Sequence, residues 1–130
     1  PLCQEVDIKN FCEENNIYLE AWSPLGGGSV LGDTRLKTIA DKYNKSVAQV
    51  ILRWDLQNGI ITIPKSVHEA RIIQNADVYD FEISDDDMEE INGFDADKRS
   101  LWYGDFYWSG NPDGFKDSVD VWDDQDQFNK

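Results

Sequence analysis

The spacing of hydrophobic and polar residues changes along the chain and divides it into helices and strands. From Val6 to Glu14 the apolar residues recur at helical spacing, which predicts an amphipathic helix. The stretch from Ile17 to Trp22 is short and apolar, which is typical of a strand. The proline and three glycines of Ser23–Gly28 then predict a loop that is not helical.

Two helices with clear start signals follow this loop. Asp33 is a good N-cap for a helix that extends through Tyr43. Ser46 and Gln49 form a capping-box pattern that opens a second helix, and Gly59 is expected to end it. The residues predicted to face the core are Leu36, Ile39, Ala40 and Tyr43 in the first helix, and Val47, Val50, Ile51 and Trp54 in the second.

The β-branched run from Ile60 to Ile63 predicts a second strand. A serine followed three residues later by an acidic residue then occurs twice, at Ser66 and at Ser84, and each pair predicts a capping box. The first box opens a helix to about Asn75, and the second opens a helix that carries Met88.

The predicted order is therefore helix, strand, two helices, strand, helix and helix. Strands joined by helices indicate an α/β fold with a parallel sheet and a right-handed crossover. Two parallel strands do not make an independent sheet, because both faces and both edges need cover. The pattern thus predicts part of a larger α/β fold.

The spacing of hydrophobic residues becomes irregular after Phe94. Residues 95–130 show little periodicity, yet they are too aromatic for a typical disordered segment. We interpret 1–94 as the folded body and 95–130 as an irregular tail that packs on it, with a substrate-lining or partner-binding loop as the alternative. The aromatic residues of the tail are Trp102, Tyr103, Phe106, Tyr107, Trp108, Phe115, Trp122 and Phe128.

Composition and charge narrow the classes of function. The 130 residues fit one domain, and a net charge of −14 argues against binding to a nucleic acid backbone, though not to a small anion. We expect no membrane segment, no signal peptide and a cytoplasmic location. Cys3 and Cys12 are expected to be free thiols, and no metal site is predicted. Because the chain begins at Pro1, we expect it to be processed, trimmed or a piece of a longer protein.

Two loops carry candidate binding chemistry. Lys65 and Ser66 follow the second strand and precede a helix that carries Arg71, an arrangement suited to a phosphate; an ordinary charged helix start is the alternative. After the first strand, the glycine run lets the backbone approach a ligand, with Ser23 and Trp22 beside it. A plain loop is the alternative there.

Catalytic chemistry is harder to find. The chain has one histidine, His68, which we interpret as a surface residue at a helix start, so no nucleophilic triad can be assembled. The acidic runs Asp85–Asp87 and Asp123–Asp124 are interpreted as solvated faces or as charges at helix N-termini. No acid–base pair is predicted.

Several motifs, in order and spacing, resemble the C-terminal part of an aldo-keto reductase, in particular the microbial branch that reduces small aldehydes and diketo sugars. The resemblance covers roughly Pro1 to Phe94. The motifs are Ala21-Trp22-Ser23-Pro24-Leu25-Gly26, Ser46-Val47-Ala48-Gln49-Val50-Ile51-Leu52-Arg53-Trp54, Ile63-Pro64-Lys65-Ser66-Val67, Asn75-Ala76-Asp77-Val78-Tyr79-Asp80-Phe81 and Ser84-Asp85-Asp86-Asp87-Met88.

The resemblance implies a partial (β/α)8 barrel that binds NADPH, with Ile17–Trp22 as the seventh strand and Ile60–Ile63 as the eighth. His68 stands where the family often has threonine, and Gln74 where it often has glutamate. The implied cofactor contacts are Trp22 on the nicotinamide; Ser23 and Leu25 along the pyrophosphate; Lys65, Ser66 and Val67 at the 2′-phosphate and ribose; and Arg71, Gln74 and Asn75 at the adenine.

The family's catalytic Asp, Tyr, Lys and His come from the first half of the barrel, so the resemblance implies no catalytic residue in this chain. We expect the C-terminal fragment of an NADPH-dependent reductase that acts on an aldehyde or ketone when complete. The alternative is a non-catalytic half-barrel that forms a homo-oligomer, with or without bound NADP(H).

Overall fold

A computed structural model describes residues 1–96, which lie within the first of two units of the chain, Pro1–Lys98. The predicted tail falls almost wholly outside the described residues, and so do all of its aromatic side chains. Within the described part, the backbone N–H of Ala96 donates a hydrogen bond to the carbonyl of Leu2 at 3.1 Å.

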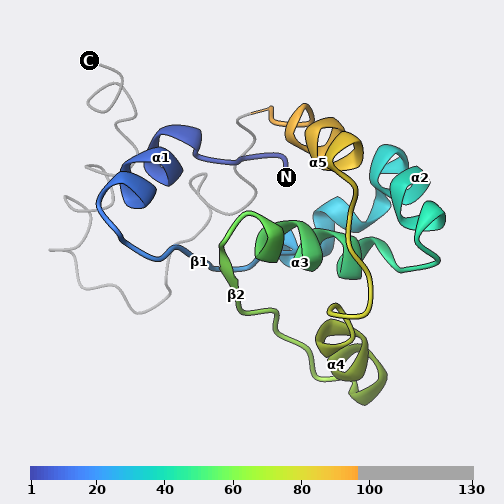
Figure 1. The fold of residues 1–130 in the computed structure, drawn as a ribbon. Helices are drawn as coiled ribbons and strands as arrows, with labels where there is room; N and C mark the ends of the chain where they lie inside the picture. Colours follow the sequence, from blue (N-terminus) through green and yellow to red (C-terminus); the bar gives the residue numbers. More distant parts are fainter. Residues whose placement is uncertain (97–130) are drawn as a thin grey trace, which may run out of the picture. The chain divides into compact units, whose positions relative to one another are not determined.

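The predicted order of helices and strands is confirmed, with one short 3-10 segment added (Figure 1). In order, the elements are α1 (Val6–Glu14), β1 (Glu20–Ala21), η1 (Gly26–Gly32), α2 (Thr34–Lys42), α3 (Val47–Gln57), β2 (Ile61–Thr62), α4 (Glu69–Ala76) and α5 (Asp85–Asn92).

The two strands pair in parallel, as predicted, but each is only two residues long. Glu20 is in register with Ile61, and Ala21 with Thr62. The predictions of strands over Ile17–Trp22 and Ile60–Ile63 were too long. In the described part of the chain each strand has only the other as a partner, so the flanking extended residues have no further ladder to join.

The prediction that Ser23–Gly28 is not helical is confirmed by the backbone angles of Gly27 and Gly28, although a 3-10 segment is assigned from Gly26 onward. The 3-10 segment η1 begins at Gly26, although its backbone is kinked. Gly27 and Gly28 have φ angles of 63° and 94°, a left-handed region that glycine adopts without a steric penalty. These two glycines let the chain turn from the end of β1 toward α2.

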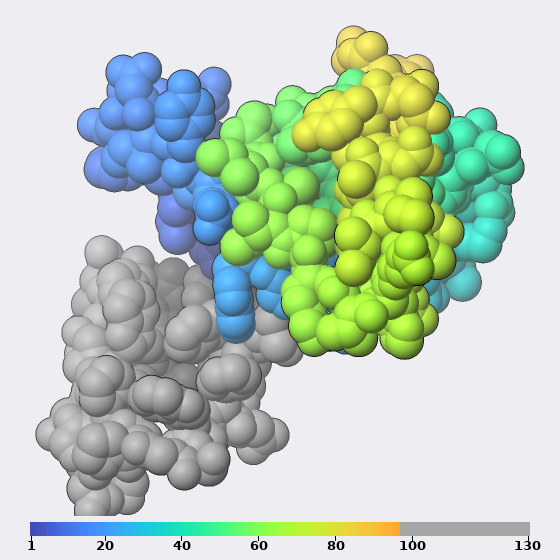
Figure 2. All heavy atoms as spheres, turned by 90° about the horizontal axis from the view of Figure 1, so that it is seen from below, coloured from blue at the N-terminus to red at the C-terminus, as the bar shows by residue number. Residues whose placement is uncertain are grey.

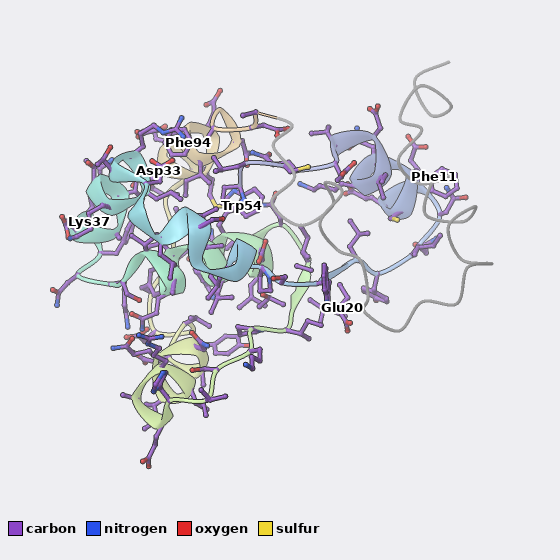
Figure 3. The ribbon with its side chains drawn as sticks, turned by 180° about the vertical axis from the view of Figure 1, so that it is seen from behind. Phe11, Glu20, Asp33, Lys37, Trp54 and Phe94 are labelled. Atoms are coloured by element: carbon purple, nitrogen blue, oxygen red, sulfur yellow. The ribbon has the colours of Figure 1, made fainter. Side chains whose placement is uncertain are left out.

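The core lies between α2, α3 and α5. The predicted faces of α2 and α3 are confirmed, since Leu36, Ile39, Val50 and Ile51 are completely buried. The predicted caps of these two helices are present, at Asp33 and at the Ser46–Gln49 box. Figure 3 shows Asp33, Lys37, Trp54 and Phe94 gathered around this core, with Phe11 of α1 away from it.

A hydrogen-bonded cluster joins α2 to the start of α5. Ser84 caps α5 by accepting from the backbone N–H of Asp87, but the reciprocal half of the predicted box is not made. Asp87 instead accepts from Lys42 and Tyr43, and it is 6% exposed. The interpretation of Asp85–Asp87 as charges at a helix N-terminus is confirmed, since all three lie in the first turn of α5, but Asp87 is not solvated because a tertiary ion pair buries it.

Candidate functional site

The two candidate loops leave the same edge of the sheet. Because β1 and β2 are parallel and in register, their C-terminal ends point the same way, and the residues that follow them emerge on one side. Trp22 follows β1 directly, and Lys65 comes three residues after Thr62, the last residue of β2. This is the edge at which α/β folds place their ligands.

The loop after β1 makes a tight turn through backbone conformations that most residues avoid. Ser23 has a φ angle of 53°, which is unusual for a residue other than glycine, and its carbonyl accepts from the N–H of Gly26 at 2.8 Å. The space around the Cα of Gly27 is open. Trp22 keeps 59% of its surface exposed. Leu25 is partly buried and packs against the core.

The segment after β2 differs from its prediction in detail. Ser66 and Glu69 do not form a capping box. Instead, Ser66 Oγ accepts from the N–H of His68 at 3.2 Å, and α4 begins at Glu69, two residues later than a helix capped by Ser66 would begin. His68 is the N-cap residue and is exposed, as predicted for a helix start. Arg71 consequently lies in the first turn of α4.

Lys65 and Arg71 are the two Lys or Arg side chains, among the eight in residues 1–96, whose charged groups contact no described protein group. Both are exposed. Two cations without a described protein partner can each pair with an external anion, even on an acidic protein. The side chains with protein partners are Lys9, Arg35, Lys37, Lys42, Lys45 and Arg53.

Helix α4 stands on the surface and contributes no buried residue. Gln74 is exposed and Asn75 is half-buried in its last turn. Figure 2 shows α4 and the segment leading to it, in green to yellow-green, on the surface. The predicted adenine contacts Arg71, Gln74 and Asn75 thus share one short helix, which comes soon after the predicted phosphate contacts Lys65 and Ser66.

Sequence reasoning missed the groups that anchor the C-terminal end of α4. Lys45 Nζ contacts the carboxylates of Asp77 and Asp80 at 3.0 and 2.7 Å. Gln49 Nε2 donates to the carbonyl of Asp77, the C-cap residue, at 2.8 Å. These partners lie about thirty residues apart in sequence, and no local spacing signals them.

A buried carboxylate lies beneath β2. Asp55 of α3 is 4% exposed, and Thr62 Oγ1 lies 3.3 Å from its Oδ2. Burial raises the pKa of Asp55 to about 6, against the lowering effects of the nearby terminal amine and the Thr62 hydroxyl. This carboxylate was also missed, since an acidic residue at that position of a helix reads as exposed.

Comparison with known protein families shows to which family this chain belongs. Residues 1–96 match the Aldo/keto reductase family. The chain belongs to that family. Glyoxal reductase of Bacillus subtilis is 52% identical over 99 residues, which are 76% of this chain and 36% of that protein. The 9,11-endoperoxide prostaglandin H2 reductase of Trypanosoma cruzi is 43% identical over 118 residues, which are 88% of this chain and 39% of that protein.

A solved structure agrees with the sequence comparison. The apo crystal structure of Gox0644 has a TM-score of 0.71 and 46% identity, covering 73% of this chain and 35% of that one. A variant of Gox0644 in complex with NADPH matches equally well. This aldo/keto reductase chain therefore spans little more than a third of the length of these relatives, and its described residues are a partial barrel with few strands.

The partial barrel leaves an uncharged groove beside β2. Its volume is about 650 Å³, and its walls come from β2, the end of α3 and the end of α4. No charged side chain lines it, although 29% of the residues of the whole chain are charged. The apolar wall includes Tyr18, Ile61 and Tyr79.

The described residues of this aldo/keto reductase chain offer neither a metal site nor a membrane span. No group of three or more His, Cys, Asp or Glu side chains is arranged to hold a metal ion within them. None of the helices in residues 1–96 has the length and apolar character needed to cross a membrane. Cys3 and Cys12 are not joined in a disulfide.

Proposed function

We propose that this chain is the C-terminal half of an NADPH-dependent aldo/keto reductase and that it holds the cofactor, while the catalytic groups come from the other part of the barrel. The observation that carries the proposal is the pair of unpaired cations, Lys65 and Arg71, at the start of α4. A phosphate monoester at that position would receive two cations and the positive end of a helix.

The adenosine end of NADPH is assigned to the segment after β2. Lys65 and Ser66 contact the 2′-phosphate, and Val67, which is 75% exposed, lies beside the ribose. The planar guanidinium of Arg71 stacks on the adenine and reaches the same phosphate. Gln74 and Asn75 contact the adenine edge. The exposure of this segment supports the assignment, because each side chain except half-buried Ser66 and Asn75 is open to solvent.

The nicotinamide end is assigned to the loop after β1. Trp22 stacks on the nicotinamide ring, while Ser23 and the backbone of Leu25 lie along the pyrophosphate. The left-handed backbone of Ser23 and the open space at Gly27 support a close approach of the phosphates to this loop. When bound, NADPH supplies the hydride that reduces a carbonyl carbon; this chain's residues bind and orient it.

The test is a titration of the 130-residue chain with NADPH and with NADH. We expect NADPH to bind more tightly, and Lys65→Ala and Arg71→Ala to reduce NADPH affinity far more than NADH affinity. Lys37→Ala is the matched control, because Lys37 pairs with Asp41 on the surface of α2. Equal loss for both cofactors would contradict the assignment of the 2′-phosphate. Rapid NADPH-dependent reduction of a small aldehyde by the purified chain would contradict the absence of catalytic groups.

A second candidate is a non-catalytic half-barrel that forms a homo-oligomer. It is favoured by the exposed face of the two-stranded sheet, where Ile61 and Ile63 are 47% and 44% exposed. Open strand edges and apolar faces of this kind are normally covered by another segment or another copy. Light scattering over a range of concentrations tests it, and a strictly monomeric chain would contradict it.

A further inference from the structure

We propose that two copies of this chain join through the open edge of β2, with the two β2 strands antiparallel and Thr62 of one copy facing Thr62 of the other. The partner is a second copy of the chain, related to the first by a two-fold axis that passes between the two threonines. The inference rests on the second candidate function, the homo-oligomer, and names its interface; it does not depend on the NADPH site. The result would be one four-stranded sheet, in which the two β2 strands lie at the centre.

The backbone of β2 leaves one donor and one acceptor on its open edge. The N–H of Ile61 donates to the carbonyl of Leu19 at 2.9 Å, so the backbone groups of Ile61 face β1. Successive residues of a strand turn these groups to opposite edges, so the N–H and C=O of Thr62 face away from β1. On that side neither group has a hydrogen-bond partner among the described residues. Two Thr62 residues that face each other in an antiparallel pair would exchange both hydrogen bonds.

The exposed side chains of β2 fit the same register. Thr62 Oγ1 lies 3.3 Å from Asp55 Oδ2, so the Thr62 side chain faces α3, and Ile61 and Ile63 lie on the other face of the strand. Both isoleucines are exposed. When Thr62 pairs with itself, Ile61 of each copy lies directly opposite Ile63 of the other, and cross-strand pairs of this kind stabilise a sheet. One register therefore satisfies the open backbone groups and covers the apolar side chains together.

The surface beside this edge carries no charge, which favours contact between two acidic chains. The net charge of −14 makes two copies repel each other at long range. The groove of about 650 Å³ beside β2, however, has no charged side chain among the described residues that line it. Tyr79 forms part of its wall and is 75% exposed. A second copy placed here would cover apolar surface without burying an unpaired charge.

Two cysteine variants of the full chain test the register. Ile61→Cys and Ile63→Cys are purified separately, mixed and oxidised, and mass spectrometry identifies the disulfides. In the proposed pair, positions 61 and 63 of opposite copies have Cα atoms about 4.5 Å apart, within the reach of a disulfide. Two copies of the same position lie diagonally, about 7–8 Å apart, which is too far. We expect the 61–63 disulfide in the mixture and little disulfide at these positions in either variant alone. Equal yields in all three samples would overturn the register.

Sedimentation equilibrium tests the interface without a crosslink. Tyr79→Glu should raise the dissociation constant of the dimer about tenfold or more, because it places two like charges in the contact. Phe11→Glu is the matched control: it adds the same charge at an exposed aromatic residue of α1 that does not line the groove, and should change the constant by less than about threefold. Circular dichroism checks that both variants remain folded.

The outcomes separate the interface from the homo-oligomer itself. If wild type dimerises but the two glutamate variants behave alike, the homo-oligomer stands and the interface at β2 is overturned. If wild type is monomeric at every concentration, the second candidate function and the interface fail together, and the edge of β2 is left for a different protein chain. The NADPH titration is unaffected by either result, so the first proposed function is judged separately.

Discussion

The phenol of Tyr43 accepts a hydrogen bond from the backbone N–H of Ser84 at 2.9 Å. Tyr43 is the C-cap residue of α2, and Ser84 is the N-cap residue of α5. A side chain from one helix thus satisfies a backbone donor at the start of another, a role that the acidic residue of a capping box would otherwise fill. The same phenol donates to Asp87 at 2.5 Å.

Tyr43→Phe should therefore lower the free energy of unfolding by about 1–2 kcal/mol, because it leaves a backbone donor and a mostly buried carboxylate each without one partner. Urea denaturation measures the change. Tyr18→Phe is the control, since Tyr18 is 85% exposed and should change stability by less than about 0.5 kcal/mol. Equal effects of the two substitutions would show that the Tyr43 hydroxyl does not stabilise the junction.

Asp55 should make the chain less stable as the pH rises. Its pKa is about 6 in the folded state and near the ordinary value of 3.8 when unfolded, so the folded state binds more protons between these values. Stability from this group is then present below about pH 4 and is lost as the pH rises through about 6, to the extent of up to about 3 kcal/mol.

Asp55→Asn removes this ionisation and keeps an acceptor for Thr62. We expect the variant to be more stable than wild type by about 1–3 kcal/mol near pH 8, with a smaller difference near pH 4.5. Urea midpoints at the two pH values measure it. A constant difference between the proteins across this range would show that Asp55 titrates normally.

Lys65→Ala and Arg71→Ala should leave the free energy of unfolding within about 0.5 kcal/mol of wild type, because both side chains are exposed and contact no described protein group. Their effect should appear in NADPH binding instead. Thermal unfolding with and without NADPH checks both statements: the cofactor should raise the midpoint for wild type and raise it less for the variants. A strongly destabilised Lys65→Ala protein would indicate a structural role for this cation.

Ile51→Ala and Ile72→Ala test which apolar residues the isolated chain buries. Ile51 is completely buried, and its truncation should cost about 2–5 kcal/mol. Ile72 of α4 is 52% exposed, and its truncation should cost less than about 0.5 kcal/mol. A large cost for Ile72→Ala in urea denaturation would mean that another copy covers α4, which would favour the homo-oligomer.

Local patterns predicted the helices well because a helix is largely a local structure. The predicted starts at Asp33 and Ser46 are correct, since each cap is completed within one turn. The prediction failed at Ser66. Glu69 again follows three residues later, but the Ser66 hydroxyl accepts from the N–H of His68 rather than from that of Glu69. The strands were predicted in the right places but too long, because their length depends on neighbours that no local pattern reports.

The sequence by itself determined the order of the elements, the buried faces of α2 and α3, and the two loops that carry the candidate cofactor contacts. Only the tertiary structure decided which cations are available for a ligand. Lys42 pairs with Asp87, and Lys45 pairs with Asp77 and Asp80; each partner is more than thirty positions away in sequence. Lys65 and Arg71 have no such partner in the described residues. An ion pair forms between groups that folding brings together, so its presence or absence cannot be read from spacing along the chain.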